Sequence, residues 1–353
     1  MGNRLRYVRV PVTNRTRVQF LAYFCLLNFV VFVHRDGWKA RSALISLGTE
    51  VTAIAACKID DQTRVDLFRK AFQSWTSVPE ISEIIVVDWG SSTSIHEILS
   101  KYTFGTRSST SISVIRVDNA QTWRLGAAIN VGIFRAQKDI VLKLDCDTYL
   151  AHNFLNVNNL YGVGFRFADG RVSLDANGKH LNGVFLARKK HLIDIHAFDE
   201  RFEFYGYDDS DLYNRLTAHI SSLGQYTSAS SSLQRMQNGS VLITHLEHER
   251  TRVHIGEKRF EQFGNCFNKK SLSHVGAWTV QSRHSFEVIR TKLIKMENFD
   301  VNLSVQRILS RPESLQRLLP RAICLQQSFE CAGMGQANES DVYAIDSLVC
   351  GRT

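Results

Sequence analysis

The 353-residue sequence lacks several patterns that would each point to a common class of protein. It holds no internal repeat, which is the signature of repeat architectures. Its seven cysteines form no C-x-x-C pair and no zinc-binding spacing. Basic residues beyond the N-terminus are not gathered with aromatic residues, as in a nucleic-acid-binding surface. We therefore expect neither a repeat array, nor a zinc finger, nor a nucleic-acid binder.

Acidic residues are absent from the first seventeen residues, which hold five arginines and leave only +4 of the net charge of +9 to the rest of the chain. Residues 18–33 follow as an apolar run broken only by Gln19 and Asn28. A basic flank before an apolar run is typical of a signal-anchor whose N-terminus stays in the cytosol. We expect a basic cytosolic tail at 1–17, a transmembrane signal-anchor at 18–33 and a short stem at 34–49. The alternatives are a cleaved signal peptide and a soluble protein with a buried N-terminal helix.

From residue 50 onward, apolar runs alternate with helical patterns. Buried strands are predicted at 51–57, 84–88 and 140–144, and helices at 64–75 and 122–136. This β-α-β alternation predicts an α/β fold with a mostly parallel sheet flanked by helices. We expect one catalytic domain over 50–265, followed by an extension of unknown role at 266–353. Within the extension, 304–309 and 314–319 have the pattern of short amphipathic helices, and the C-terminal cysteines are the candidates for disulfides.

The strand predicted at 140–144 ends in Asp145-Cys146-Asp147. Because strand side chains alternate between faces, we expect Asp145 and Asp147 on the same side, where they can share one ligand. Ligands of open α/β sheets lie outside the carboxyl ends of the strands. Hard oxygen ligands there suit Mg²⁺ or Mn²⁺ held with substrate phosphates. A turn that only caps a helix is the plainer alternative.

A second acidic cluster, Tyr205-Gly206-Tyr207-Asp208-Asp209, opens a helical pattern. Asp208 and Asp209 are therefore expected at a helix N-terminus, where the macrodipole and the free N–H groups favour an ionised carboxylate. An ionised carboxylate can accept the proton of an attacking hydroxyl. Ordinary N-capping by Asp is the alternative.

Together these motifs resemble the GT-A glycosyltransferases. Residues 50–150 look like the nucleotide-sugar half of the family 2 type, and residues 180–250 resemble the acceptor module of the β-1,4-galactosyltransferases of family 7. The segments that carry the resemblance are 86–92, 124–132, 144–147, 182–189, 198–202 and 206–216. The resemblance implies a Rossmann-like GT-A fold. The chain departs from the family at Asp208, Ser210 and His196-Ala197, where Glu, an acidic residue and Gly-Gly are common, and these departures bear on acceptor preference.

Roles for single residues follow from the resemblance. It implies Asp209 as the catalytic base and Asp147 with His245 as metal ligands, and His248 is a weaker candidate for the metal. The residues implied at the donor are Asp88, against the uracil, and Arg124 and Asp145, against the ribose and diphosphate. The residues implied in acceptor binding are Tyr205, Gly206, Asp208 and Gly183.

The activity implied is an inverting transfer of a hexose or N-acetylhexosamine, galactose- or GalNAc-like, from a UDP-sugar to a hydroxyl of a glycan or glycoconjugate. The expected cofactor is Mn²⁺, or Mg²⁺. With the signal-anchor, we expect a single-pass type II protein of the Golgi or ER membrane whose catalytic domain is lumenal. One alternative is a metal-dependent nucleotidyltransferase, which predicts a Gly-rich basic loop after the first strand that residues 57–61 do not form. The other is a non-catalytic glycan-binding relative with the same fold.

Overall fold

The computed structural model divides the chain into two compact units, Met1–Thr49 and Glu50–Thr353, and the residues it describes all belong to the second. The described residues are 50–101, 110–118, 123–161, 163–168, 181–202, 206–224, 233–235, 242–248, 266–270, 286–295 and 302–310. The predicted tail, signal-anchor and stem, and the helix predicted at 314–319, lie outside them. Among these described segments, no helix combines the length and the apolar character needed to cross a membrane.

One sheet of nine strands organises the described residues, in the order β10-β11-β3-β2-β1-β4-β7-β6-β8. Its strands are β1 (Val51–Cys57), β2 (Ile81–Asp88), β3 (Ser111–Asp118), β4 (Ile140–Leu144), β6 (Phe165–Phe167), β7 (Phe185–Arg188), β8 (Leu233–Arg235), β10 (Phe286–Lys295) and β11 (Asn302–Ser310). The strands from β11 to β4 pair in parallel, whereas β10 and β7 are antiparallel to their neighbours. The mixed, mostly parallel α/β sheet that the sequence predicts is confirmed.

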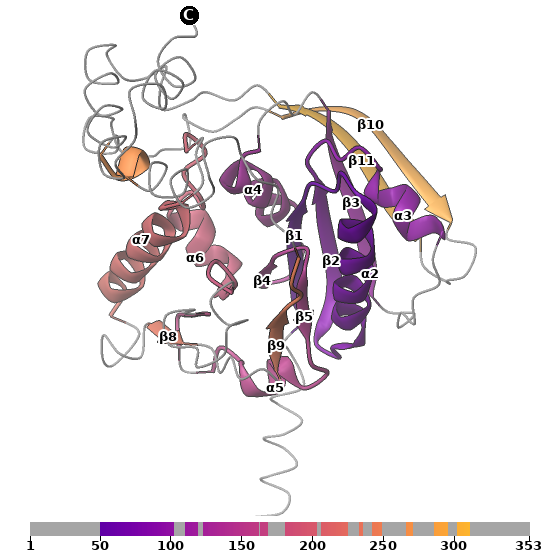
Figure 1. The fold of residues 1–353 in the computed structure, drawn as a ribbon. Coiled ribbons are helices and arrows are strands. Elements are labelled where there is room, and N and C mark those ends of the chain that lie inside the picture. Colours follow the sequence, from indigo (N-terminus) through magenta and orange to yellow (C-terminus); the bar gives the residue numbers. More distant parts are fainter. Residues whose placement is uncertain are drawn as a thin grey trace, which may run out of the picture. The chain divides into compact units, whose positions relative to one another are not determined.

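Helices cover both faces of this sheet (Figure 1). On one face, α2 (Gln62–Ser77), α3 (Ile95–Lys101) and the short α5 (Phe154–Val157) pack with every second residue of β1, from Val51 to Cys57. On the other face, α4 (Leu125–Arg135), α6 (Lys189–Asp194) and α7 (Asp208–Ser222) pack with Ile54 and Ala56. Because a strand presents alternate side chains to opposite faces, a strand at the centre of a sheet covered on both sides needs apolar residues on both of its faces, and β1 is apolar apart from Thr52.

Strands β10 and β11 lie beyond residue 265 and extend the sheet past β3. The helix predicted at 304–309 is wrong, because these residues belong to β11, whose register places Val305 opposite Val114 and Ile308 opposite Val117. Apolar residues at 305, 308 and 309 fit a helical stripe when they are considered alone. The parallel edge of β3 offers a full ladder of backbone hydrogen bonds, and this tertiary pairing overrides a weak local preference.

Helix α4 lies close to the sheet and joins the two halves of the fold. A Cβ atom on Gly132 would overlap Cγ2 of Ile54 in β1, so only glycine permits this approach. Asn130, which is fully buried, donates from Nδ2 to the Phe198 carbonyl at 2.8 Å and to Glu200 Oε1 at 2.7 Å, and its Oδ1 accepts from the Phe198 amide at 2.9 Å. The segment that leads into α7 is therefore fixed on α4.

We predict that Gly132→Ala lowers the free energy of unfolding by about 1–3 kcal/mol, because overpacking of a closed core has roughly this cost. The loss is expected although alanine normally stabilises a helix interior by about 1 kcal/mol relative to glycine. Urea unfolding followed by circular dichroism measures it. In an Ile54→Ala background, which removes the overlapping methyl group, the same substitution should cost less. An unchanged or raised unfolding midpoint for Gly132→Ala would contradict the close approach.

Candidate active site

The Asp145-Cys146-Asp147 motif lies in a tight turn after β4. The Thr148 amide donates to the Asp145 carbonyl at 3.0 Å, and the Asp145 amide donates to the Thr148 hydroxyl at 3.2 Å. Since β4 ends at Leu144, Asp145 and Asp147 leave the sheet in a turn and do not alternate along a strand. A disulfide joins Cys146 to Cys57 at the end of β1, a bridge that the sequence does not predict. The turn is thereby fixed to the centre of the sheet, and its two carboxylates have different partners.

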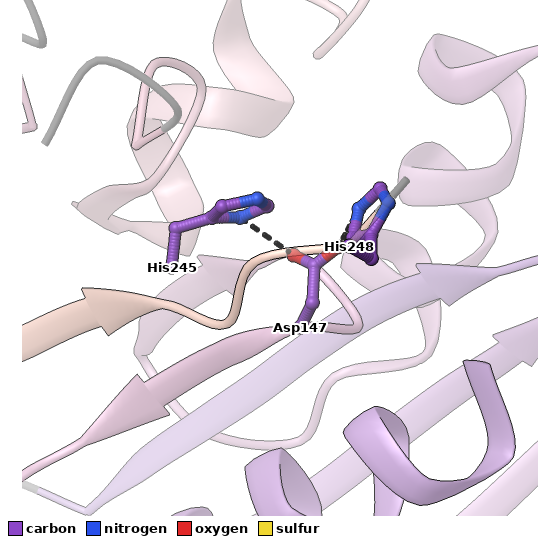
Figure 2. Close-up of side chains that lie close together, drawn as sticks. All are labelled: Asp147, His245 and His248. Carbon is purple, nitrogen blue, oxygen red and sulfur yellow. Dashed lines mark hydrogen bonds and ion pairs between the residues drawn. The ribbon is translucent and has the colours of Figure 1, made fainter. Parts of the chain in front are cut away.

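A small antiparallel sheet brings two histidines to Asp147. Strands β5 (Thr148–Leu150) and β9 (Ile243–His245) pair with Thr148 opposite His245, and the Leu246 amide donates to the Asp147 carbonyl at 2.8 Å. His245 Nδ1 lies 3.2 Å from Asp147 Oδ1, and His248 Nε2 lies 3.0 Å from Asp147 Oδ2 (Figure 2). All three side chains are buried, and one donor atom from each lies within 4.8 Å of the other two. His248, the weaker candidate in the sequence, thus completes a triad with the predicted pair.

The donor atoms of this triad fit a divalent transition metal. Burial alone would raise the pKa of Asp147, but hydrogen bonds from His245 and His248 outweigh burial and hold that pKa below its ordinary value. The carboxylate is therefore charged at neutral pH. A mixed set of carboxylate and imidazole donors suits Mn²⁺ better than Mg²⁺, which prefers oxygen ligands. Arg64 of α2 places the positive charge of its guanidinium group 3.4 Å from the Asp147 carboxylate.

The second acidic cluster begins α7, as predicted, with Asp208 and Asp209 in its first turn. The backbone that leads into the helix adopts an unfavourable conformation. Gly206 has a φ of 102°, and Tyr207, the N-cap residue, has a φ of 70°. A left-handed conformation at a non-glycine residue costs roughly 1–3 kcal/mol and persists only where the surroundings enforce it. Asn268 contributes to this by donating from Nδ2 to the Gly206 carbonyl at 2.8 Å. Tyr205, the other predicted acceptor residue here, lies outside the described residues.

A buried lysine connects the two acidic clusters. Lys143 of β4 has a side chain that is 1% exposed, and its Nζ donates to Asp145 Oδ1 at 2.7 Å. A Cβ atom on Gly183, whose φ is 90°, would lie 2.9 Å from that nitrogen and 2.7 Å from Asp209 Oδ2. The ammonium group and the Asp209 carboxylate therefore converge over the backbone of Gly183. Lys143 is not among the residues that the sequence motifs point to, and the one signal for it in the sequence is a single charge inside the apolar run at 140–144.

The pKa of the Asp209 carboxyl is raised by its surroundings. Burial, and next the charge of Asp208, raise the pKa of Asp209 from 3.8 to about 7, while Lys143 opposes the rise. Its Oδ1 atom is buried and accepts no hydrogen bond from the described residues. The expectation that the helix N-terminus favours the ionised form is corrected here. A helix terminus contributes about 0.3–1 kcal/mol, which is less than the cost of removing a carboxylate from water.

The other predicted donor residues lie at the ends of β2 and α4. Asp88 is fully buried, accepts from the amides of Ser91 and Ile95 at 3.0 and 3.2 Å, and pairs with Arg116 at 2.7 Å. It therefore organises the turn after β2 and the start of α3. Arg124 is the buried N-cap residue of α4. It stays a prediction that Asp88 contacts uracil and that Arg124 contacts a diphosphate.

Two protein-family models match successive parts of the chain. The model described as "Glycosyl transferase family 2" matches residues 65–157, and the model described as "N-terminal domain of galactosyltransferase" matches residues 173–248. The first range contains the Asp145–Asp147 turn, and the second contains Asp209 and both histidines of the triad. These matches confirm the resemblance that the motifs indicate. No curated protein sequence matches the chain.

Several solved structures are similar to this chain. Drosophila β1,4-galactosyltransferase 7, in complex with manganese, UDP-Gal and xylobiose, is 15% identical, with 75% of this chain and 95% of that chain covered and a TM-score of 0.47. Glucosyl-3-phosphoglycerate synthase from Mycobacterium tuberculosis is 16% identical, with 76% and 91% covered and a TM-score of 0.41. A mannosyltransferase from Pyrobaculum calidifontis is 14% identical, with 64% and 65% covered and a TM-score of 0.43.

The raised pKa of Asp209 predicts how stability depends on pH. In the unfolded chain this group titrates near 3.8 and in the folded chain near 7, so the folded state binds the extra proton between these values. Stability from this group is therefore fully present below about pH 4 and is lost as pH rises to about 7. We predict that the free energy of unfolding of the wild type, minus that of Asp209→Asn, falls by about 2–4 kcal/mol over this window. Urea titrations at half-unit pH steps measure the difference.

The matched control for this titration is Asp66→Asn, which changes an exposed carboxylate on α2. Its difference curve is the baseline for an exposed carboxylate over the same window. A curve for Asp209→Asn that coincides with this baseline would contradict the raised pKa of Asp209.

Proposed function

We propose that this glycosyltransferase, of GT-A type, moves a hexose or N-acetylhexosamine from a UDP-sugar to a hydroxyl of a glycan, with inversion at the anomeric carbon. The observation that carries the proposal is the convergence of two acidic clusters on Lys143, beside a buried triad of metal-ligand type. The match of residues 173–248 to a galactosyltransferase model supports a galactose- or GalNAc-like donor. Asp208, Gly206 and Gly183, which surround Asp209 at the start of α7, are proposed to contact the acceptor.

The donor diphosphate is proposed to bind beside the metal triad. Asp147, His245 and His248 would hold Mn²⁺, and a bound Mn²⁺ supplies neutralisation of the charge that builds on the departing diphosphate. Arg64, 3.4 Å from Asp147, adds a fixed positive charge at the same place. Asp145 is turned toward Lys143 and is only half-buried, which leaves it accessible to the donor.

Asp209 is proposed as the general base. As the acceptor oxygen forms its bond to the anomeric carbon, the bond from that carbon to the diphosphate breaks and the hydroxyl proton passes to Asp209. A single displacement of this kind inverts the configuration. A pKa of about 7 makes the carboxylate a stronger base than an ordinary Asp while much of it stays ionised at neutral pH. The buried Oδ1, which accepts no hydrogen bond within the described part of the chain, is the proposed acceptor atom for that proton.

A lumenal location is part of the proposal. The disulfide between Cys57 and Cys146 supports an oxidising compartment, because such bonds persist in the ER lumen and outside the cell and are rare in the cytosol. The basic tail at 1–17 and the apolar run at 18–33 support a single-pass type II anchor in the Golgi or ER membrane.

A panel of UDP-sugars and glycan acceptors, assayed with Mn²⁺ on the purified full-length chain, tests the function through two variants. Asp209→Asn should bind UDP with wild-type affinity and lose about 10²–10⁴-fold in transfer rate, because only the proton acceptor is removed. Asp147→Ala should lose the Mn²⁺-dependent part of UDP affinity, measured by calorimetry with and without the metal. Near wild-type transfer by Asp209→Asn would exclude it as the base, and unchanged Mn²⁺-dependent UDP affinity in Asp147→Ala would exclude the metal site.

Lys143 is proposed as a positioning residue that acts through Asp209. Lys143→Met, which keeps the length of the side chain and removes its charge, should raise the pKa of Asp209 further. The acid limb of the kcat/KM profile should then move at least one pH unit higher, so that transfer falls about tenfold near pH 7 and recovers at alkaline pH.

The conservative variant Lys143→Arg, which retains the positive charge, is the control, and its acid limb should stay in place. A purely structural role for Lys143 would instead lower activity by the same factor at every pH in Lys143→Met.

A further inference from the structure

A second cluster of metal-ligand type lies between α6 and α7, apart from the proposed active site. His191 and Asp194 are three residues apart on α6 and therefore share one face of that helix. His219 lies in the last turn of α7, with its Nε2 3.3 Å from Asp194 Oδ2 and its ring centroid 5.4 Å from that of His191. One donor atom from each of the three lies within 4.8 Å of the other two. His219 is about 16 Å along α7 from Asp208, given the rise of about 1.5 Å per residue.

The buried state of His191 indicates that this cluster binds a ligand. The residue is 4% exposed, yet neither of its ring nitrogens has a hydrogen-bond partner among the described residues. A buried polar group left without a partner costs roughly 1–3 kcal/mol, so a native interior normally supplies one.

We propose that His191, Asp194 and His219 bind Zn²⁺, with solvent completing the coordination, and that the ion clamps α6 to α7. Two imidazoles and one carboxylate are a common zinc ligand set. Ligands about 2.0–2.1 Å from a tetrahedral ion lie about 3.3 Å apart, and the His219–Asp194 pair already has this separation. The zinc site does not require the proposed sugar transfer, and it shares no ligand with the Asp147 triad.

The charges around the cluster set its expected affinity. Lys190 donates to Asp194 at 2.6 Å, and Arg188 and Lys190 both act on His191 as nearby positive charges. The Lys190 side chain is 76% exposed, so its ion pair contributes little and a metal ion can displace it. We therefore expect a binding site of moderate affinity that is specific to a transition metal.

The clamp would stabilise the helix that carries Asp208 and Asp209. The chain between α6 and α7 adopts left-handed conformations at His196 and Ala197, with φ of 63° and 57°. Arg215 of α7 holds this segment by donating to the carbonyls of Ile195 and Ala197 at 2.9 and 2.7 Å. Arg215 is one attachment between α7 and the segment after α6. A metal ion bound by His191, Asp194 and His219 would be a second attachment, between α6 and the C-terminal end of α7.

Zinc titration of the metal-stripped full-length chain tests the proposal in an Asp147→Ala/His245→Ala background, which removes the first metal site. We expect one equivalent of Zn²⁺ to bind, the thermal unfolding midpoint to rise with Zn²⁺, and Co²⁺ to give the visible absorption of a bound ion. Adding His191→Gln or His219→Gln should weaken Zn²⁺ binding at least tenfold and abolish the thermal shift. His152→Gln, which changes an exposed histidine elsewhere, should leave both unchanged.

The metal-free unfolding midpoints separate loss of a ligand from loss of the fold. Asp194→Asn changes a partly exposed side chain and serves as a further variant where a histidine substitution fails to fold. Equal Zn²⁺ affinity in the background and in folded variants at these three positions would overturn the proposal. So would the absence of Zn²⁺ binding by the background protein.

Discussion

The buried ammonium group of Lys143 is the constraint on which the arrangement of the site depends. A charge removed from water must be compensated by opposite charge and hydrogen bonds. Asp145 supplies the hydrogen bond, and Asp145 and Asp209 together raise the pKa of Lys143 although burial alone would lower it. The carboxylates that compensate Lys143 come from the Asp145–Asp147 turn and from the start of α7. The same condition requires a glycine at position 183, because a Cβ atom there would occupy the space that the two charged groups use.

The balance of charge divides the carboxylates into two chemical types. Asp147 gains two histidine partners and is held ionised, as a metal ligand must be. Asp209 is buried beside Asp208 with one cation to share, and its pKa rises to about 7, as a base near neutral pH requires. The pKa of the same residue type thus moves in opposite directions in one site. Hydrogen bonds from two histidines outweigh burial at Asp147, whereas burial and the charge of Asp208 outweigh Lys143 at Asp209.

Local patterns in the sequence predict the central strands, helices α2 and α4, the position of Asp145 and Asp147 after β4, and the start of α7. These local patterns cannot predict contacts between residues that are distant in the sequence. The disulfide of Cys57 with Cys146 and the second histidine of the triad depend on where β1, β5 and β9 meet. Strand β11 depends on the open edge of β3, and the buried state of Lys143 depends on a carboxylate 66 positions away in the sequence. The periodicity of apolar residues along the sequence carries no information about these tertiary contacts.

The two halves of the site are joined at the level of single hydrogen bonds. Asn130 on α4 satisfies the backbone of Phe198 and the side chain of Glu200, and Arg215 on α7 satisfies the carbonyls of the strained turn before it. Each partner is buried or half-buried, so each bond would be costly to leave unmade. Asp209 is therefore positioned by a chain of contacts that begins on α4. A donor that orders the Asp145–Asp147 turn and an acceptor that contacts α7 would act on one connected set of groups, and Lys143 lies where the two meet.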